Sequence, residues 1–308
     1  MFKMIDLFAG IGGIRLGIEQ SFSNHDLQCV FSSEINPHSI KTYQTNFTNA
    51  PIFGDITKIN EQDIPDHDLL LAGFPCQPFS QAGLKKGFSD DRGSLFFDIK
   101  RILSCKKPRA FLLENVKNLK GHDKGRTLHT ILDHLQEEGY QVFHSLLKSR
   151  DFGVPQNRER LYILGFLDPT IRFKFPDPLG GKTRLGDILE KEVSDKYTIS
   201  NKLWEGHQRR KINNKIAGKG FGYSLFFDHS EFTNTLSARY YKDGSEILIY
   251  QKDKNPRKLT PRETARLQGF PDSFAIPVSD VQAYIQFGNS VTVPVIKELG
   301  REIRRSLS

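Results

Sequence analysis

The chain has 308 residues, of which 37% are apolar and 26% are charged, and these proportions exclude a disordered or fibrous protein. Its 44 Lys and Arg outnumber its 36 Asp and Glu, and the resulting net charge of +8 favours a polyanionic partner without requiring one. The length predicts one large domain with a smaller one beside it.

The spacing of the cysteines and the hydropathy of the chain indicate the cellular compartment in which the protein is expected. Cys29, Cys76 and Cys105 are far apart, with neither zinc-ligand spacing nor an even disulfide framework, so we expect a reducing cytoplasm and no metal. No apolar run approaches the roughly 20 residues that cross a bilayer, so we expect no membrane segment. The apolar start of the chain is interrupted by Asp6 and Arg15, which predicts a buried strand and turn instead of a signal sequence.

Short apolar runs alternate with segments of helical period from Lys3 to Glu114, which predicts a parallel sheet with helices on both faces. After Phe166 the sequence becomes rich in Pro, Gly, Lys and Arg, which indicates a domain boundary. The last stretch, Val293 to Leu307, has the spacing of an amphipathic helix on the main core. The expected strands are Met4–Phe8, Cys29–Ser33, Leu69–Ala72, Ala110–Leu113, Val142–Leu147 and Leu161–Phe166, and the expected helices are Ile14–Phe22, His38–Phe47 and Leu95–Leu103.

A glycine-rich segment, DLFAGIGGIRLG, follows the first predicted strand and opens a helix. Gly10 and Gly12 allow a sharp turn that a ligand could approach, although a plain strand-to-helix connection would look the same. Glu34 ends the second apolar run where an acidic residue reaches a ribose in dinucleotide-binding folds, while the glycine spacing departs from the nicotinamide fingerprint. Asp55, in FGDIT, is suited to accept a bond from an exocyclic amine. Ordinary solvated carboxylates remain the alternative for both acidic residues.

Reactive side chains follow two other predicted strands. Cys76, in GFPCQPFS, lies in a loop at the carboxyl edge of the sheet, where a thiol is better placed to react than to pack. Glu114, in LLENV, ends a neighbouring strand, so that a thiol and a carboxyl can converge over one crevice, although each could be a filler or a cap. Arg158 and Arg160, in QNRERLYILG, alternate on a strand entrance and are expected to face one side, with a surface pair as the alternative.

The segments DLFAGIGG, GFPCQPFS, ENV, QNRER and QFGNSVTVPV occur in this order, and RKLTPRETARLQGFPDSF precedes the last of them. With these motifs the chain resembles the DNA cytosine-5 methyltransferases of bacterial restriction-modification systems, and the resemblance covers most of residues 3 to 175 and 257 to 296. It implies an α/β, Rossmann-like fold of the S-adenosylmethionine-dependent methyltransferases with a smaller target-recognition domain. The catalytic domain would span 1–180, completed by 283–308, and the recognition domain 181–282.

The same resemblance implies an S-adenosylmethionine site and a catalytic set. Cys76 would attack carbon 6 of a flipped-out cytosine, Glu114 would hold ring nitrogen 3 and the exocyclic amine, and Arg160 would contact the base carbonyl, with Arg158 beside it. Carbon 5 would then accept the methyl group. The cofactor would be lined by Phe8, Gly10, Gly12, Glu34, Ile35, Asp55, Ile56, Pro75, Leu95, Asn289 and Val291.

Contacts to double-stranded DNA are expected from two regions. Glycines and lysines after Cys76 predict a basic lid, with a solvated loop as the alternative. Residues 181–256 match no general motif and correspond to the region that reads the target sequence in the family, although a charge run is also typical of a solvated face. The expected DNA-binding residues are Gln77, Ser80, Lys85, Lys86, Arg209, Arg210, Lys211, Thr235, Arg239 and Tyr240.

Three alternatives stay open at this point: a transfer-RNA cytosine methyltransferase with the same residues, a nicotinamide oxidoreductase, and a binding protein that has lost catalysis. The glycine-rich turn alone supports the second, and the intact Cys76, Glu114 and arginines argue against the third. We expect a monomer in the bacterial cytoplasm, associated with the nucleoid. A cognate restriction endonuclease would act on the same DNA sequence without a stable complex.

Overall fold

The computed structural model describes residues 1–22, 26–47, 51–74 and 95–308. They form two compact units, between which the chain passes four times. The first unit contains Met1–Leu147, Glu159–Asp177 and Val295–Ser308, and the second contains Lys148–Arg158 and Pro178–Pro294. Among the described residues, no helix is both long enough and apolar enough to cross a membrane.

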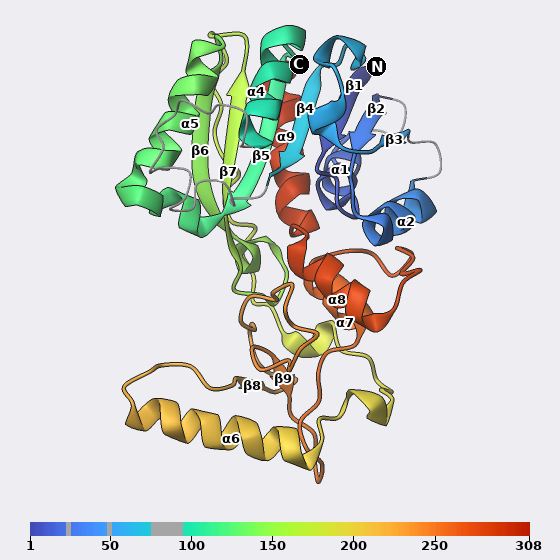
Figure 1. The fold of residues 1–308 in the computed structure, drawn as a ribbon, viewed down its shortest axis with the longest axis vertical. Helices are drawn as coiled ribbons and strands as arrows, with labels where there is room; N and C mark the ends of the chain where they lie inside the picture. Colours follow the sequence, from blue (N-terminus) through green and yellow to red (C-terminus); the bar gives the residue numbers. More distant parts are fainter. Residues whose placement is uncertain (23–25, 48–50, 75–94) are drawn as a thin grey trace. The chain divides into compact units, whose positions relative to one another are not determined.

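A seven-stranded sheet forms the centre of the first unit, in the order β3-β2-β1-β4-β5-β7-β6 (Figure 1). The pairs from β3 to β5 are parallel, and β7 runs antiparallel to β5. Each of the six predicted strands overlaps an observed one, so the expected α/β class with a parallel sheet is confirmed. The bounds are β1 Phe2–Leu7, β2 Leu27–Ser33, β3 Ile52–Phe53, β4 Leu69–Gly73, β5 Ala110–Val116, β6 Gln141–Lys148 and β7 Glu159–Phe166.

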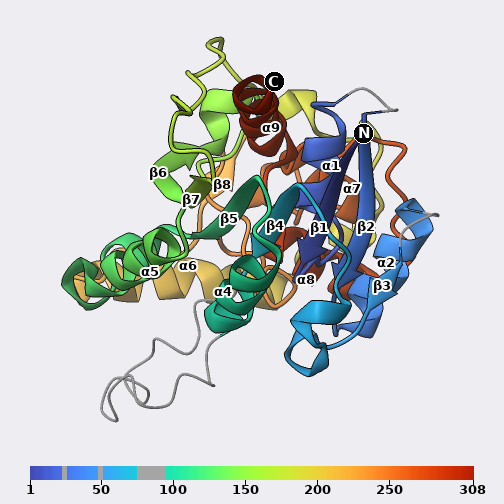
Figure 2. The same ribbon diagram turned by 90° about the horizontal axis from the view of Figure 1, so that it is seen from above.

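Helices cover both faces of this sheet (Figure 2). Helices α4 (Leu95–Lys106) and α5 (Arg126–Glu137) lie on one face, and α1 (Gly13–Glu19) and α9 (Val293–Leu307) lie on the other. Because both faces are buried, β4 is apolar at successive positions instead of alternating. Helix α2, at Pro37–Asn46, begins with Pro37 after the side chain of Asn36 caps its first turn.

The second unit contains little regular structure. Its elements are α6 (Asn201–Ile216), α7 (Pro261–Leu267), α8 (Asp280–Asn289) and the two-stranded parallel sheet β8 (Leu225–Phe226) with β9 (Leu248–Ile249). Helices α5 to α8 are not among the predicted ones. In α6 the reason is physical: its sequence, NKLWEGHQRRKINNKI, has too few apolar residues to show a helical period.

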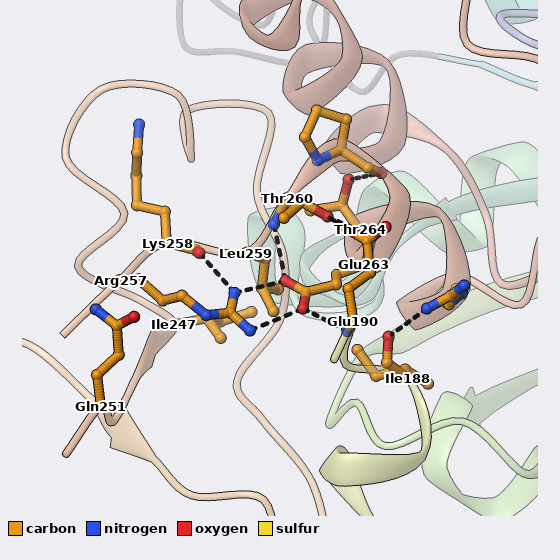
Figure 3. A network of polar contacts seen from close by, with 12 residues as sticks. Ile188, Glu190, Ile247, Gln251, Arg257, Lys258, Leu259, Thr260, Glu263 and Thr264 are labelled. Carbon is orange, nitrogen blue, oxygen red and sulfur yellow. Dashed lines mark hydrogen bonds and ion pairs between the residues drawn. The ribbon is translucent and has the colours of Figure 1, made fainter. Parts of the chain in front are cut away.

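Polar contacts hold the second unit together around α7 (Figure 3). The guanidinium of Arg257 donates to both oxygens of Glu263 at 2.7 and 2.8 Å, and both side chains are buried. The Glu263 carboxylate also accepts from the backbone N–H of Thr260 at 2.8 Å and of Glu190 at 2.9 Å. The Thr260 side chain accepts from Glu263 N in return, which completes a capping box at the start of α7. The RKLTPRETARLQGF motif is therefore a structural nucleus of this unit.

We predict that Glu263→Gln lowers the stability of the second unit by about 3–5 kcal/mol, because it leaves the buried Arg257 cation uncompensated. Asp272→Asn is the matched control, since it removes an ion pair with Arg266 in which the carboxylate is 65% exposed, and solvent screens such pairs so that they add little to stability. Urea denaturation followed by circular dichroism measures both variants. Equal midpoints for the two variants would contradict the structural role given to Glu263.

Candidate active site

Two hydrogen bonds connect the glycine-rich turn after β1 to the end of β2. Ala9 N donates to Ser33 O at 2.9 Å, and Gly10 N donates to Glu34 Oε2 at 2.8 Å. The other oxygen, Glu34 Oε1, accepts from the backbone N–H groups of the next two residues, each at 2.8 Å. A carboxylate has about four acceptor positions, so Glu34 can fix the turn and still accept a bond from a ligand hydroxyl.

The two predicted glycines serve different purposes. Both have left-handed φ, 56° at Gly10 and 82° at Gly12. A Cβ on Gly12 would lie 2.3 Å from the ring of Phe47, whereas a Cβ on Gly10 would meet no atom within 4 Å. Gly12 is therefore required for packing against α2, while Gly10 borders open space that a ligand could occupy. Phe8, between β1 and this turn, also has a left-handed φ of 53°, which is unusual for a bulky residue.

Other predicted cofactor residues of the first unit lie at this same edge of the sheet. Ile35 directly follows Glu34 and is 71% exposed, although it is a large apolar side chain. The Asp55 carboxylate accepts from Thr57 Oγ1 and Thr57 N at 2.8 and 3.1 Å, and these bonds hold the pKa of Asp55 below its usual value. Leu95 begins α4 and is partly buried.

Two predicted cofactor residues need correction. The side chain of Ile56 is 2% exposed and packs in the core of the first unit, and its carbonyl accepts from Arg101 at 2.6 Å, so its side chain is not a ligand contact. Val291, in the second unit, is 4% exposed and equally buried. Asn289 ends α8 in the second unit and is exposed. Pro75 lies outside the described residues.

The ends of β4, β5 and β7 bring together a carboxylate and a guanidinium. Gly73, the last residue of β4, is the register partner of Glu114 in β5, and a Cβ on Gly73 would lie 3.7 Å from Glu114 Oε2. Arg160, in β7, places its Nε 3.1 Å from Glu114 Oε1, and both side chains are about seven-eighths buried. Arg160 is in β7, the strand next to β5, so the sheet holds Arg160 and Glu114 beside each other as a preorganised ion pair. The predicted convergence of Glu114 with the Cys76 thiol stays a prediction, because Cys76 lies outside the described residues.

Asn115 is a site residue to which the sequence analysis assigns no role. It follows Glu114 and is 2% exposed, and its Nδ2 donates to the carbonyl of Phe74 at 3.0 Å. This bond fixes the chain two residues before Cys76. The ENV motif contained the signal, but only its glutamate suggested chemistry. Cys76 and the predicted lid residues Gln77, Ser80, Lys85 and Lys86 lie outside the described residues.

The expectation that Arg158 and Arg160 face one side is wrong. Arg158 belongs to the second unit and is 1% exposed. Its guanidinium donates to the carbonyls of Leu236, Gly288 and Ser290 at 2.9, 3.1 and 2.5 Å. Through these hydrogen bonds Arg158 connects the end of α8 to the segment that contains Leu236. Arg160 instead pairs with Glu114.

The predicted DNA-binding residues of the second unit divide by burial. Tyr240 is 0% exposed; its hydroxyl donates to Ile247 O at 2.7 Å and accepts from Leu259 N at 2.7 Å, so the prediction that it contacts DNA is wrong. Thr235 Oγ1 donates to Asn157 O at 2.8 Å, and Arg239 is exposed.

Helix α6 has an inner and an outer side. On the inner side, Arg210 pairs with Asp243 at 3.0 Å and donates to Gly222 O at 2.8 Å, and Lys211 Nζ lies 4.3 Å from the centre of the Tyr223 ring. The outer side carries Lys202 and Arg209, which are exposed and have no ion pair among the described residues. Arg210, which was predicted to contact DNA, is thus used within the protein.

Comparison with known proteins gives one consistent result. The sequence model of the family described as C-5 cytosine-specific DNA methylase matches residues 2–305. The type II methyltransferase M.NlaX of Neisseria lactamica is 67% identical over 308 residues, which are 100% of this chain and 98% of that protein. M1.ScrFI of Lactococcus lactis subsp. cremoris, also a type II methyltransferase, is 65% identical over 98% of this chain and 78% of its own length.

Solved structures share the fold. The Dnmt2 methyltransferase of S. pombe superposes with a TM-score of 0.82 at 22% identity, covering 100% of both chains. A Spodoptera frugiperda DNMT2 mutant gives 0.82 at 24% identity, again over 100% of both chains. The expected Rossmann-like methyltransferase fold is thereby confirmed.

We predict different outcomes for alanine at the two glycines. Gly12→Ala lowers the melting temperature strongly, because the new methyl group collides with Phe47 in addition to the roughly 1–2 kcal/mol cost of a left-handed L residue. Gly10→Ala carries the conformational cost alone and fills space beside the turn, so it affects ligand binding more than stability. Thermal denaturation and calorimetric titration separate the two effects. A larger loss of stability in Gly10→Ala would contradict this assignment.

Proposed function

The chain belongs to the family of C-5 cytosine-specific DNA methylases, and from this premise we propose how its residues carry out the reaction. The enzyme transfers a methyl group to carbon 5 of a cytosine within a specific DNA sequence, as a type II methyltransferase of a restriction-modification system. The observation that supports the residue assignment best is the Glu114–Arg160 pair beside Gly73, because the loop with Cys76 begins at that glycine.

We assign the cofactor S-adenosylmethionine to the turn after β1. The open space over Gly10 provides room for it, and the remaining acceptor capacity of Glu34 suits a ribose hydroxyl. Ile35 offers an exposed apolar surface for the adenine ring, and the ionised Asp55 suits the exocyclic amine. The residues present therefore fit the cofactor. When bound, it supplies a methyl group on a positively charged sulfur.

We assign the covalent step to Cys76. Its thiolate bonds to carbon 6 of the cytosine, and the ring electrons move to carbon 5, which becomes a nucleophile. Glu114 and Arg160 act on the opposite side of the ring: a proton shared with Glu114 at nitrogen 3 disperses the negative charge, and Arg160 donates to the base carbonyl. Carbon 5 takes the methyl group, which leaves the cofactor as a neutral thioether. Water then removes the proton from carbon 5, and the electrons of that bond restore the aromatic ring and expel Cys76 as a thiolate.

Arg158 takes a structural role in this proposal. With its guanidinium committed to three backbone carbonyls, it positions α8 and hence Asn289, and does not touch the base. The target cytosine is turned out of the duplex, since its ring atoms are inaccessible in a stacked helix.

Target recognition is assigned to the predicted domain 181–282, and within it to residues 181–256, which lie wholly in the second unit. Lys202, Arg209 and Lys215 of α6 contact phosphates, while Lys211 packs on the Tyr223 ring and Thr235 and Arg239 lie closer to the bases. The enzyme acts as a monomer on double-stranded DNA in the bacterial cytoplasm, close to the nucleoid. A restriction endonuclease cuts the same sequence without forming a stable complex with it.

Bisulfite sequencing of duplex DNA treated with the purified protein and S-adenosylmethionine tests the proposal. We expect protected cytosines at one position of one short sequence. Protection of transfer RNA with none on DNA would instead favour the RNA alternative, and full conversion of the cytosines in both nucleic acids would contradict the assigned chemistry.

We predict that Cys76→Ser abolishes methyl transfer while S-adenosylmethionine binding stays within about twofold of wild type. A hydroxyl does not ionise near neutral pH as a thiol does, so no adduct to carbon 6 forms. Transfer of labelled methyl groups to DNA measures the first quantity, and calorimetric titration measures the second. Turnover near the wild-type rate would exclude Cys76 as the nucleophile.

We predict that replacing Lys202, Arg209 and Lys215 with Gln weakens binding to all DNA sequences and reduces the slope of log K against log salt by up to about 3, because each phosphate contact contributes about 0.9. The choice of target sequence is retained. Arg210→Gln is the control, since it removes an internal ion pair and acts on stability. Fluorescence anisotropy over a range of salt, with target and scrambled duplexes, measures both; an unchanged slope would make α6 a solvated face.

A further inference from the structure

A buried polar cluster lies beneath the glycine-rich turn, and the proposed chemistry does not use it. Asp6 in β1 is 1% exposed, and its Oδ2 has no hydrogen-bond partner among the residues that the structure describes. Only Leu7 separates Asp6 from the Phe8–Gly12 turn, in which Phe8, Gly10 and Gly12 have left-handed φ. Arg15 and Tyr43, at 7% and 0% exposed, complete the cluster from α1 and α2.

The hydrogen bonds of the cluster run in one direction. Arg15 Nη1 donates to the Tyr43 hydroxyl at 3.0 Å, so the single hydrogen of Tyr43 is left for Asp6 or for Ser32. The Ser32 hydroxyl lies 2.7 Å from that of Tyr43 and 3.3 Å from the Cys29 sulfur. The Cys29 thiol also donates to the carbonyl of Phe31 at 3.5 Å, and when Ser32 donates to Tyr43, the Tyr43 hydrogen is left for Asp6, so that every hydrogen has an acceptor. This pattern ends on a carboxylate, which fits an ionised Asp6.

The charged groups that act on Asp6 lie on α1, which carries Arg15 and Glu19, and just after β2, where Glu34 stands. Burial raises the pKa of Asp6 to about 7, opposed by the Arg15 cation and increased by the carboxylates of Glu19 and Glu34. Arg15 Nε is itself paired with Glu19 at 2.6 Å, so these two charges largely cancel. Burial also raises the pKa values of Tyr43 and Cys29, which therefore stay neutral. Asp6 and Glu34 remain as net negative charge at the turn.

An ionised Asp6 lowers the stability of the folded protein. Its pKa is higher folded than unfolded, so its stabilising contribution is complete below the unfolded value of about 4 and is lost as pH rises through 7. A neutral residue of the same shape would be more stable above pH 7. Natural sequences keep such destabilising groups chiefly where function needs them.

We propose that Asp6 is a positioning residue for S-adenosylmethionine: held by Tyr43 beneath the Phe8–Gly12 turn, its negative charge favours the cationic sulfur of the cofactor over a neutral one. The residue acts through the turn, without touching the ligand, and its carboxylate, which is buried from water, adds to the charge of Glu34. This inference rests on the proposed function of the turn as the cofactor site.

Two ligands separate a charge effect from a shape effect. S-adenosylmethionine and S-adenosylhomocysteine share the adenosyl and amino acid groups, but the sulfur is a cation in the first and a neutral thioether in the second. Calorimetric titration at pH 8 is expected to give Asp6→Asn about tenfold weaker affinity for S-adenosylmethionine and less than threefold weaker affinity for S-adenosylhomocysteine. Asp68→Asn, at the opposite end of the sheet in the same unit, is the control and changes neither affinity.

The wild type provides a second measurement that does not depend on a variant. Its preference for S-adenosylmethionine over S-adenosylhomocysteine should fall between pH 8 and pH 5.5 as Asp6 becomes protonated, and Asp6→Asn should show no such change. The melting temperature of Asp6→Asn relative to wild type should be higher at pH 8 than at pH 5.5. Together these readouts distinguish a charge role from a packing role.

Equal losses for both ligands in Asp6→Asn, or a wild-type preference that is constant with pH, would overturn the proposal while leaving the cofactor site intact. If Asp6→Asn does not fold, Tyr43→Phe replaces it: loss of the hydroxyl raises the pKa of Asp6, and the fall in preference should move to higher pH. An unmoved profile would overturn the proposal. Failure of the wild type to bind either ligand would overturn the proposed function and this inference together.

Discussion

The parallel pairing of β2, β1, β4 and β5 is the constraint on which the proposed active site depends. In parallel strands all carboxyl ends lie at one edge, so the residues that follow them are brought together whatever their distance in sequence. Glu34 after β2, the turn after β1, Gly73 at the end of β4 and Glu114 in β5 all come to this edge in that way. The antiparallel β7 then adds Arg160 from its opposite end.

Hydrogen bonds from side chains to backbone turn this shared edge into a fixed geometry. Glu34 accepts three backbone N–H groups, and Asn115 donates to the carbonyl of Phe74, so both loops are held where they leave the sheet. Such preorganisation matters for catalysis, because groups already aligned need no rearrangement during the reaction. A side chain that the sequence suggests as a ligand contact, such as Glu34, thus also holds its loop in place through hydrogen bonds to the backbone.

The second unit relies on other contacts than the first for its stability. Its sheet of two short strands supplies few ladder bonds, and buried guanidinium groups add hydrogen bonds among its loops and short helices. Arg158 joins carbonyls of two segments, one at Leu236 and one at the end of α8, and Arg257 joins Glu263 at the start of α7. Arginine suits this purpose because its planar fork holds several donors in fixed directions. The loops of this unit are therefore determined by specific polar contacts.

The sequence by itself determined most strands of the first unit and suggested its reactive residues. Apolar runs and glycine-rich turns depend on local periodicity, so six of the seven strands of the large sheet could be predicted, whereas the two-residue β3 and helix α5 were not predicted. The tertiary structure alone decided which polar side chains are free. Arg158 is a candidate for base contact in sequence, and Arg210 and Tyr240 are candidates for DNA contacts, but most of their hydrogen-bond partners lie from 12 to 132 residues away. Burial of Asp6 depends on helices from two other segments. Long-range packing has no local signal, and for that reason the sequence could name these residues without revealing what they do.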